Sequence, residues 1–416
     1  MSLMGTPTGL RLQIGLFGRR NVGKSSTMNA LTRQSTSIVS STAGTTTDPV
    51  SKGLELSPFG AVSLIDTAGV DDEGVLGARR VERAYAEASR VDVAVVVVDS
   101  SRDDWWSSYE DSLVASCAAR ARPVLVVVNK TDACSAERLT TISRSLTGRG
   151  VAYVLFSATR ACELGAGAPD LVAALARLAP ESCLTPPPLV SDLVEPGSVV
   201  VLVTPLDRAA PQCRLILPQV QTLRELLEAG VICVVAQPSN LSASLSRLTT
   251  SPSLVITDSQ AFKEVASLVP ESVPLTSFSI LFARQKGDLS SFYAGARALD
   301  RLTGASRVLV AESCAHRPIE EDIGTVKIPK MLRARYGESL VIDHVQGRDF
   351  PAPDALSGYD LIVHCGGCMT TRGAILSRIA DARASRVAIT NYGLALASLT
   401  GVLERAIRPF GLVAVD

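Results

Sequence analysis

The chain has 416 residues, of which 46% are hydrophobic and 20% are charged. This composition excludes a largely disordered protein and suits domains whose sheets are buried on both faces. The 41 basic and 41 acidic side chains cancel, so the chain lacks the basic excess of proteins that bind nucleic acid mainly through phosphates. At roughly 100–200 residues per domain, this length predicts two to four domains.

Membrane spans, a secretory signal and a disulfide framework are not expected. The longest apolar runs, such as VAVVVV at 93–98, have the length of a strand and fall far short of the ~20 residues that cross a bilayer. The first residues contain no long apolar stretch ending at a small-residue cleavage site. Nine cysteines, an odd number, favour free thiols or metal ligands. We expect a cytoplasmic protein that binds neither membrane nor nucleic acid.

Short β-rich runs alternate with helix-length stretches from residue 10 to about residue 179. The runs are LQIGLF, VSLID, VDVAVVVVD, PVLVVVN and AYVLFS. Such alternation is typical of βα units around a mainly parallel sheet.

Three prolines at 186–188 indicate a linker, because a proline triplet enters neither a helix interior nor a central strand. Two further blocks follow, with the strand-like runs SVVVLV, VICVVAQ and SLVITDSQ, then SRVLVAES, YDLIVHC and SRVAITN. We therefore predict an α/β protein of three domains, at residues 1–180, 181–268 and 269–416. The second and third are smaller and have mainly parallel sheets.

The segment GRRNVGKS at 18–25 fits the phosphate-binding pattern G-x-x-x-x-G-K-[ST]. It lies between the strand LQIGLF and a helix-like stretch, which is the context that the pattern requires. Lys24 can reach the β- and γ-phosphate oxygens, and Ser25 can bind Mg²⁺. The residues expected to hold the phosphates are Gly18, Asn21, Val22, Gly23, Lys24, Ser25 and Ser26.

Two further segments end predicted strands. DTAG at 66–69 follows VSLI, so Asp66 can hold the metal through water while the Gly69 amide lies near the γ-phosphate. NKTD at 129–132 follows VLVVV, and Asp132 there can accept two hydrogen bonds from guanine, a donor pair that adenine lacks. The expected base pocket consists of Asn129, Lys130, Asp132, Ser157 and Ala158.

Together these motifs resemble the G motifs of translation-factor-class GTPases over about residues 10–178. The resemblance implies a P-loop GTPase fold that hydrolyses GTP to GDP and phosphate. GTTTD at 44–48 is similar to switch I of the TrmE/Era-like branch, which implies that Thr46 binds Mg²⁺, with Thr45 as its competitor.

Asn21 matches the P-loop asparagine that helps to hold K⁺ in potassium-dependent members of that branch. Position 70 is valine where Ras-like enzymes have a water-orienting glutamine, so water must be activated by another group. We hypothesise that Glu73 or a neighbouring acid orients it. The expected catalytic residues are Lys24, Thr46, Asp66, Gly69 and Glu73.

Cysteine and histidine gather in the third block, as C-A-H at 314–316 and H-C-G-G-C at 364–368. Each group follows or ends a predicted strand. If those strands are parallel neighbours, their carboxyl ends open into one crevice. The candidate metal ligands there are Cys314, His316, His364, Cys365 and Cys368.

The ligand types alone do not identify the metal. Zinc accepts Cys₃His, whereas one C-x-x-C and a distant cysteine suit a [4Fe–4S] cluster with one iron left to histidine, water or an exchangeable ligand. Buried core residues and a redox dithiol are further alternatives. His344 is expected to be structural, and core or surface thiols are expected at the isolated cysteines Cys117, Cys134, Cys162, Cys183, Cys213 and Cys233.

A P-loop GTPase domain followed by C-x-H and then H-C-x-x-C resembles HydF, the GTPase maturation factor family of [FeFe]-hydrogenase, over essentially the whole chain. The resemblance implies that residues 181–268 form a dimerisation domain and that residues 269–416 bind a [4Fe–4S] cluster. Its ligands would be Cys314, Cys365 and Cys368, with His316 and His364 as candidates for the fourth.

The same resemblance implies a scaffold that carries a diiron precursor bearing CO and cyanide. Radical-SAM maturases would act first. This protein would then hold the precursor and pass it to the apo-hydrogenase. The scaffold would be a homodimer, and its pairing into a tetramer is left open.

Two other interpretations compete. A TrmE/Era-type GTPase of tRNA modification or ribosome assembly, with structural zinc, would need an RNA-binding module, yet the chain has neither a basic C-terminal domain nor interleaved aromatic and basic residues. A nucleotide-regulated structural dimer would carry the cysteines and histidines as inert core.

Overall fold

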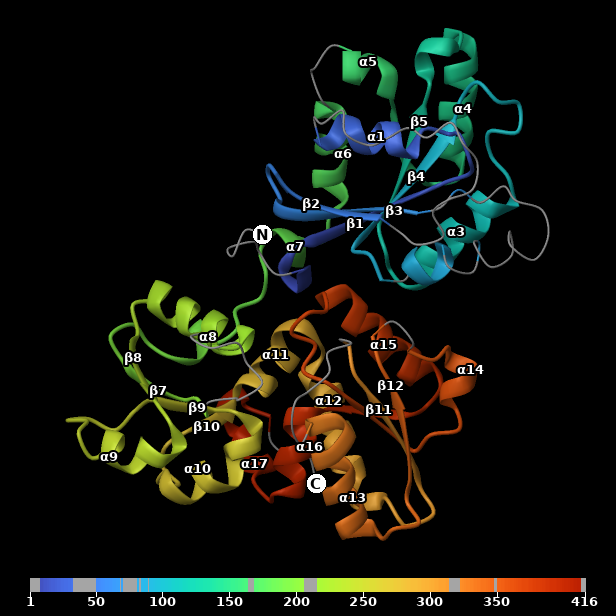
Figure 1. Ribbon diagram of the computed structural model, residues 1–416. Helices are drawn as coiled ribbons and strands as arrows, with labels where there is room; N and C mark the ends of the chain where they lie inside the picture. The colour runs from blue at the N-terminus through green and yellow to red at the C-terminus, as the bar shows by residue number, and fades with distance from the viewer. Residues whose placement is uncertain are drawn as a thin grey trace. The chain divides into compact units, whose positions relative to one another are not determined.

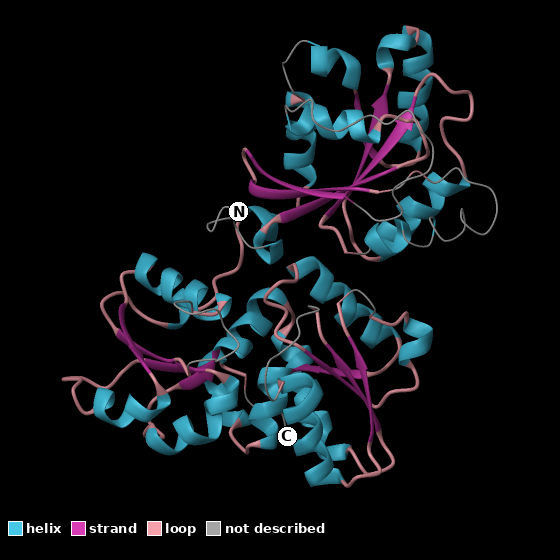
Figure 2. Ribbon diagram, viewed as in Figure 1, coloured by secondary structure: helices cyan, strands magenta, loops and turns pink. Residues whose placement is uncertain are grey.

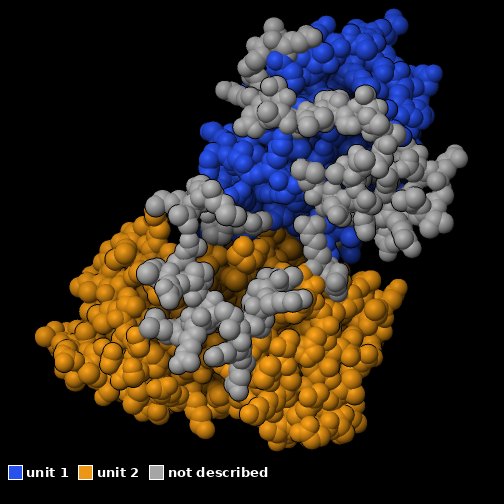
Figure 3. Space-filling view, viewed as in Figure 1, with its two compact units in different colours: residues 1–186 blue, residues 187–416 orange. Residues whose placement is uncertain are grey.

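The computed structural model describes residues 8–32, 50–67, 69, 81, 84–88, 90–163, 168–205, 215–313, 322–347 and 350–412. The chain forms two compact units, residues 1–186 and 187–416, which Figure 3 colours separately. No helix in these described ranges combines the length and the apolar character that a membrane span requires.

The first unit contains a six-stranded sheet in the order β2-β3-β1-β4-β5-β6 (Figure 1). All neighbouring strands are parallel except β2, which is antiparallel to β3. The strands are β1 (Leu12–Phe17), β2 (Val50–Leu56), β3 (Gly60–Asp66), β4 (Val93–Asp99), β5 (Val124–Asn129) and β6 (Ala152–Leu155). Only β2 was not among the predicted runs.

Helices cover both faces of this sheet (Figure 2). Every residue of the central strand β4 is buried, with Val95 in the core on one face and Val96 in the core on the other. This explains why the strand reads as a continuous apolar run. The helices are α1 (Lys24–Thr32), α3 (Ser108–Ala119), α4 (Ala136–Gly148), α5 (Ala158–Glu163), α6 (Pro169–Leu178) and α7 (Glu181–Leu184).

The second unit contains two four-stranded parallel sheets, in the orders β10-β9-β7-β8 and β12-β11-β13-β14. The first comprises β7 (Val199–Val203), β8 (Ile232–Ala236), β9 (Leu254–Thr257) and β10 (Leu275–Ser277), and the second β11 (Arg307–Ala311), β12 (Val341–Val345), β13 (Leu361–His364) and β14 (Ala388–Asn391). Because β10 pairs with β9, the first of these sheets continues past residue 268, where the sequence pattern placed a boundary. The predicted α/β class with mainly parallel sheets is confirmed.

One continuous core joins these two sheets. Val201 and Val255 from the first sheet, and Leu309 and Ile362 from the second, belong to the same cluster of buried apolar side chains. This shared core explains why residues 187–416 form one compact unit. The α-helices are α8 (Leu217–Glu228), α9 (Leu241–Leu245), α10 (Phe262–Leu268), α11 (Phe278–Lys286), α12 (Leu289–Ala298), α13 (Ile328–Tyr336), α14 (Pro353–Leu356), α15 (Arg372–Ala384), α16 (Tyr392–Leu399) and α17 (Leu403–Ile407).

Candidate functional site

The predicted phosphate loop connects β1 to α1, which begins at Lys24. The Lys24 side chain is turned into the loop, where its Nζ donates to the carbonyl oxygens of Gly18 at 2.9 Å and Arg19 at 2.8 Å. Gly23 has a φ of +97°, and a Cβ there would lie 2.2 Å from Asn129 Nδ2. Glycine is therefore required at Gly23 both for backbone conformation and for close packing.

Ser25 and Asp66 meet at the edge of this loop. The Ser25 hydroxyl donates to Asp66 Oδ2 at 2.9 Å, and Asp66 Oδ1 is buried without a hydrogen-bond partner among the described residues. Burial raises the pKa of Asp66 above its usual value, and the Ser25 hydrogen bond and Lys24 oppose that rise. Gly69 lies close to the loop, because a Cβ on it would be 2.9 Å from the Cα of Arg20. An unpaired buried carboxylate oxygen beside a hydroxyl matches the oxygen ligands that Mg²⁺ prefers.

Asn129 links the predicted base pocket to the phosphate loop. Its Nδ2 donates to the carbonyl oxygen of Val22 at 2.9 Å, and its Oδ1 accepts from the Ala158 amide at 3.0 Å. The Asn129 side chain is buried. One side chain at the end of β5 thus holds three separate segments together.

Asp132 and Lys130 lie on the same turn. The Ser157 hydroxyl donates to Asp132 Oδ1, and this hydrogen bond lowers the pKa of the exposed Asp132 carboxyl. Lys130 has a left-handed backbone, and its Nζ lies 2.5 Å from Asp99 Oδ2. The ionised Asp132 carboxylate is therefore an acceptor open to a purine base.

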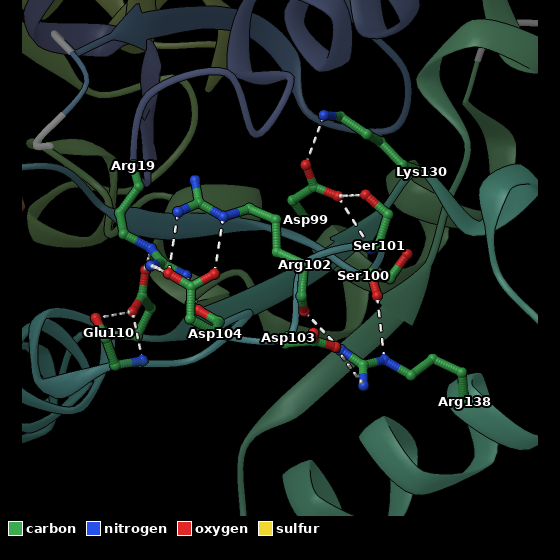
Figure 4. A network of polar contacts seen from close by, with 11 residues as sticks. Arg19, Asp99, Ser100, Ser101, Arg102, Asp103, Asp104, Glu110, Lys130 and Arg138 are labelled. Carbon is green, nitrogen blue, oxygen red and sulfur yellow. Dashed lines mark hydrogen bonds and ion pairs between the residues drawn. The ribbon is translucent and has the colours of Figure 1, made fainter.

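Arg19, at a variable position of the phosphate-loop pattern, anchors a polar network shown in Figure 4. Its Nε donates to Glu110 Oε1 at 3.1 Å and its Nη1 to Asp104 Oδ2 at 2.8 Å. Arg102 binds the same Asp104 carboxylate, and Arg138 of α4 donates to the carbonyl oxygen of Arg102. The network ties the loop to α3 and α4. No pattern in the sequence indicated it, because Arg19 lies more than 80 positions before the residues that it contacts.

Several predicted site residues cannot be placed. Thr45, Thr46, Glu73, Cys314 and His316 lie outside the described residues. Asn21 and Ser26 are described: Asn21 is exposed with a φ of +61°, and Ser26 lies in the first turn of α1.

The predicted crevice of the third block begins at two adjacent parallel strands, β11 and β13, which place Ala311 opposite His364. Just beyond these strands, the Ser313 amide donates to Cys365 Sγ at 3.1 Å. Ser313 immediately precedes Cys314 in the sequence. The condition for a shared crevice, that the two strands are parallel neighbours, is thus met. Within the described ranges no three histidine, cysteine or acidic residues are placed to hold a metal ion.

His364 is not placed as a ligand, which corrects one expectation. The ring is fully buried, its Nδ1 lies 2.6 Å from the Cys365 carbonyl oxygen, and its Nε2 lies 2.7 Å from Arg378 Nη1. Because a guanidinium only donates, Nε2 accepts and Nδ1 donates. Burial, with the Arg378 charge, lowers the pKa of His364 to about 3. Both nitrogens are engaged, so His364 is a core histidine that orients the Cys365 peptide.

Lys286 lies against the C-x-x-C loop, although no sequence pattern identified it as a site residue. Its Nζ donates to the carbonyl oxygens of Gly367, Cys368 and Thr370 at 3.1, 2.9 and 2.9 Å. Burial lowers the pKa of Lys286 to about 8, and the two cysteines oppose that change. Burial likewise raises the pKa of the Cys368 thiol, against the Lys286 charge. A cation is thus placed near both thiols of the C-x-x-C segment.

Comparison with known families gives matches to three family models. Residues 13–130 match the family model described as 50S ribosome-binding GTPase. Curated relatives of this part include the tRNA modification GTPase MnmE of Synechococcus sp., 38% identical over 132 residues that cover 31% of this chain and 27% of the relative. GTPase Der of Mycoplasmopsis pulmonis is 31% identical over 134 residues, which cover 31% of this chain and 30% of the relative. The chain thus spans less than a third of the length of these relatives.

Solved structures with detectable likeness include Era of Aquifex aeolicus bound to GDP and AlF4⁻. It has a TM-score of 0.35 and 22% identity, over 54% of this chain and 92% of that one. The rest of the chain matches two other family models, described as the hydrogen maturase F dimerization domain at 189–287 and the hydrogen maturase F tetramerization domain at 290–409. With a GTPase domain before both of these domains, the chain belongs to the hydrogen maturase F (HydF) family.

Proposed function

We propose that this protein hydrolyses GTP and serves as a cytoplasmic scaffold, which holds a [4Fe–4S] cluster and delivers a diiron precursor to apo-[FeFe]-hydrogenase. The observation that carries the proposal is the contact of the Ser313 amide with Cys365 Sγ. It joins the residue that precedes the C-x-H segment in the sequence to the C-x-x-C segment, in a chain that also has a phosphate loop.

The phosphate loop supports the GTPase part of the proposal. Ser25, Thr46 and, through water, Asp66 would hold Mg²⁺, whose positive charge offsets that of the β- and γ-phosphates. Asp66 Oδ1, which has no hydrogen-bond partner among the described residues, fits such a water-mediated contact. Asn21 would help to hold K⁺ beside the same phosphates. Asp132 would accept hydrogen bonds from guanine.

Hydrolysis transfers the γ-phosphoryl group to water and releases GDP. Lys24 would exchange its hydrogen bonds to the carbonyl oxygens of Gly18 and Arg19 for bonds to the phosphate oxygens, where charge develops in the transition state. The Gly69 amide would stabilise the same oxygens. Glu73 or a neighbouring acid would orient the attacking water.

The second unit supports the cluster part. Thiolates of Cys314, Cys365 and Cys368 would bind three irons, and His316, water or an exchangeable group would bind the fourth. When bound, the cluster supplies an iron to which a precursor can attach. The Ser313 amide and the Lys286 ammonium fit this donor set, because the amide donates to Cys365 Sγ and the Lys286 charge opposes the rise that burial causes in the pKa of the Cys368 thiol. The precursor would arrive after the work of radical-SAM maturases.

The family match to dimerization and tetramerization domains supports assembly of several copies. Strand β8 is the edge of its sheet and exposes Ile232 and Val235, while α8 exposes Val220 and Leu227. An apolar edge strand is a template for pairing with another chain. We propose that a second copy of this chain covers this edge to form the homodimer, and that pairing of dimers gives a tetramer.

Metal analysis of anaerobically reconstituted protein tests the proposal. We expect about four irons and four sulfides per chain, and a paramagnetic signal after reduction with dithionite. Cys365→Ser should lose this signal while GTP hydrolysis persists, since the two sites lie in separate units. Cys162→Ser, an exposed cysteine of the first unit, is the matched control. Zinc without iron in the wild-type protein would refute the cluster, and failure to hydrolyse GTP would refute the enzyme.

A further inference from the structure

A buried ammonium lies at the C-terminal end of α11. Lys286 is 3% exposed, and its three hydrogen bonds within the described ranges all go to carbonyl oxygens of the C-x-x-C loop. These carbonyls belong to Gly367, Cys368 and Thr370, more than 80 positions further along the chain. Carbonyl oxygens satisfy the donors of the ammonium but carry no charge to offset its own.

Arg372 makes the reciprocal contact. This residue begins α15, directly after the loop, and its Nη1 donates back to the carbonyl oxygens of Gln285 and Gly287, with the latter at 3.3 Å. The end of α11 and the C-x-x-C loop thus hold each other through two cations and five carbonyl oxygens. We call Lys286, Arg372 and these carbonyl groups the clasp.

One of the two cysteines packs against the helix that ends at Lys286. Cys368 packs against the apolar core that contains Phe278, Leu281 and Phe282 of α11. Lys286 is the last residue of that helix. Three hydrogen bonds to carbonyl oxygens fix the path of the loop. No carboxylate of the described residues pairs with the ammonium, so its positive charge favours anions beside it.

We propose that Lys286 is a positioning residue, which sets the C-x-x-C loop for ligation and supplies the positive charge that balances the bound anionic cluster. The cluster itself rests on the proposed function, whereas the control of the loop does not. Reduction adds one negative charge to a cluster, so a nearby cation stabilises the reduced form. Loss of that cation therefore lowers the reduction potential.

Two measurements on the full chain test this role. The first is amide hydrogen exchange of residues 365–371 in cluster-free protein, and the second is the midpoint potential of the reconstituted cluster, followed by electron paramagnetic resonance. The variants are Lys286→Met, which removes the charge but keeps an apolar stem, and Lys286→Arg, which keeps the charge. Lys263→Met is the matched control, because Lys263 is exposed on α10.

We expect Lys286→Met to raise exchange of the loop by about tenfold or more, since hydrogen bonds to a charged group are lost, and to shift the midpoint potential to more negative values. Lys286→Arg should restore the wild-type potential, and Lys263→Met should change neither quantity. Unchanged exchange in Lys286→Met, or equal potential shifts in the Met and Arg variants, would overturn the proposal. If the wild-type protein holds no iron, the proposed function fails, and hydrogen exchange alone decides whether Lys286 positions the loop.

Discussion

Asn129 is hydrogen bonded to Val22, a residue 107 positions earlier in the chain, through a 2.9 Å contact from Nδ2 to the carbonyl oxygen. The same side chain accepts from the Ala158 amide. The phosphate loop and the base pocket come from separate βα units, and Asn129 fixes the distance between them. A nucleotide can engage both only when this distance is correct.

Asn129→Ala should therefore weaken GTP binding. The substitution leaves the Val22 carbonyl and the Ala158 amide without their partner, at a cost of about 1–3 kcal/mol for each buried group. We expect affinity for GTP to fall by roughly ten- to a hundredfold, as measured by titration calorimetry. Thr140→Ala on the exposed face of α4 is the control. Wild-type affinity in the Asn129 variant would show that the link is dispensable.

Asp132→Asn should change the preferred base. The asparagine amide presents a donor where guanine N1–H needs an acceptor, whereas xanthine offers the complementary group. We expect preference for GTP over xanthosine triphosphate to fall by about a hundredfold or more, measured by competition between the two nucleotides. An unchanged preference for GTP would remove Asp132 from the base pocket.

Arg19→Ala should destabilise the first unit. Glu110 is buried, and it would lose its guanidinium partner while keeping its contacts with Ser107. We expect a loss of about 2–4 kcal/mol in unfolding free energy. The chain has two tryptophans, Trp105 and Trp106, and both pack against the core of this unit, so their fluorescence follows its unfolding.

The control for Arg19→Ala is Arg144→Ala, an exposed arginine of α4. It removes the same charge without touching the network of Figure 4. If both variants lose equal stability, net charge and not the network explains the effect.

Asp92→Asn should stabilise the first unit at neutral pH. Burial raises the pKa of Asp92 to about 6, against the Gln13 amide hydrogen bond and the Arg122 charge. An unfolded aspartate titrates near 3.9, so the folded state binds the proton more tightly. This contribution to stability is complete below about pH 4 and disappears as the pH rises through about 6.

The asparagine variant stays neutral at every pH. We expect the unfolding free energy of this variant to exceed that of the wild-type protein by about 2–3 kcal/mol at pH 8, and the difference to vanish near pH 4. Urea unfolding followed by tryptophan fluorescence measures both values. Asp170→Asn, at an exposed position of α6, should show no such dependence, and a pH-independent gain in the Asp92 variant would contradict the assignment.

Ile232→Lys should break the proposed dimer. Ile232 is 55% exposed on the edge strand β8, and a lysine there would place a charge in an apolar interface. We expect light scattering to show a smaller assembly than the wild-type protein forms. Leu268→Lys, at a residue 40% exposed on α10, is the control. If the Ile232→Lys variant and the wild-type protein form assemblies of equal mass, strand β8 is excluded as the dimer interface.

Local pattern was enough to predict most strands and the phosphate loop. Val93–Asp99 is a continuous apolar run because both faces of β4 are buried, and glycines with a following helix identify the loop before Lys24. Three strands were not predicted. Leu275–Ser277 has only three residues, too few to form a pattern. Val50–Leu56 carries polar residues at the edge of its sheet, and Val341–Val345, which contains His344, is a short and partly exposed edge strand. These last two strands bury little, so their pattern is weak.

The sequence by itself determined the two motif sets and the family resemblance, because these depend on residue types at short spacings. Only the tertiary structure decided that β11 and β13 are neighbours, that Arg378 engages His364 and that Lys286 reaches the C-x-x-C loop. These contacts join residues as far as 84 positions apart. Short-range periodicity carries no information about such pairs, since they depend on which strands and helices pack together.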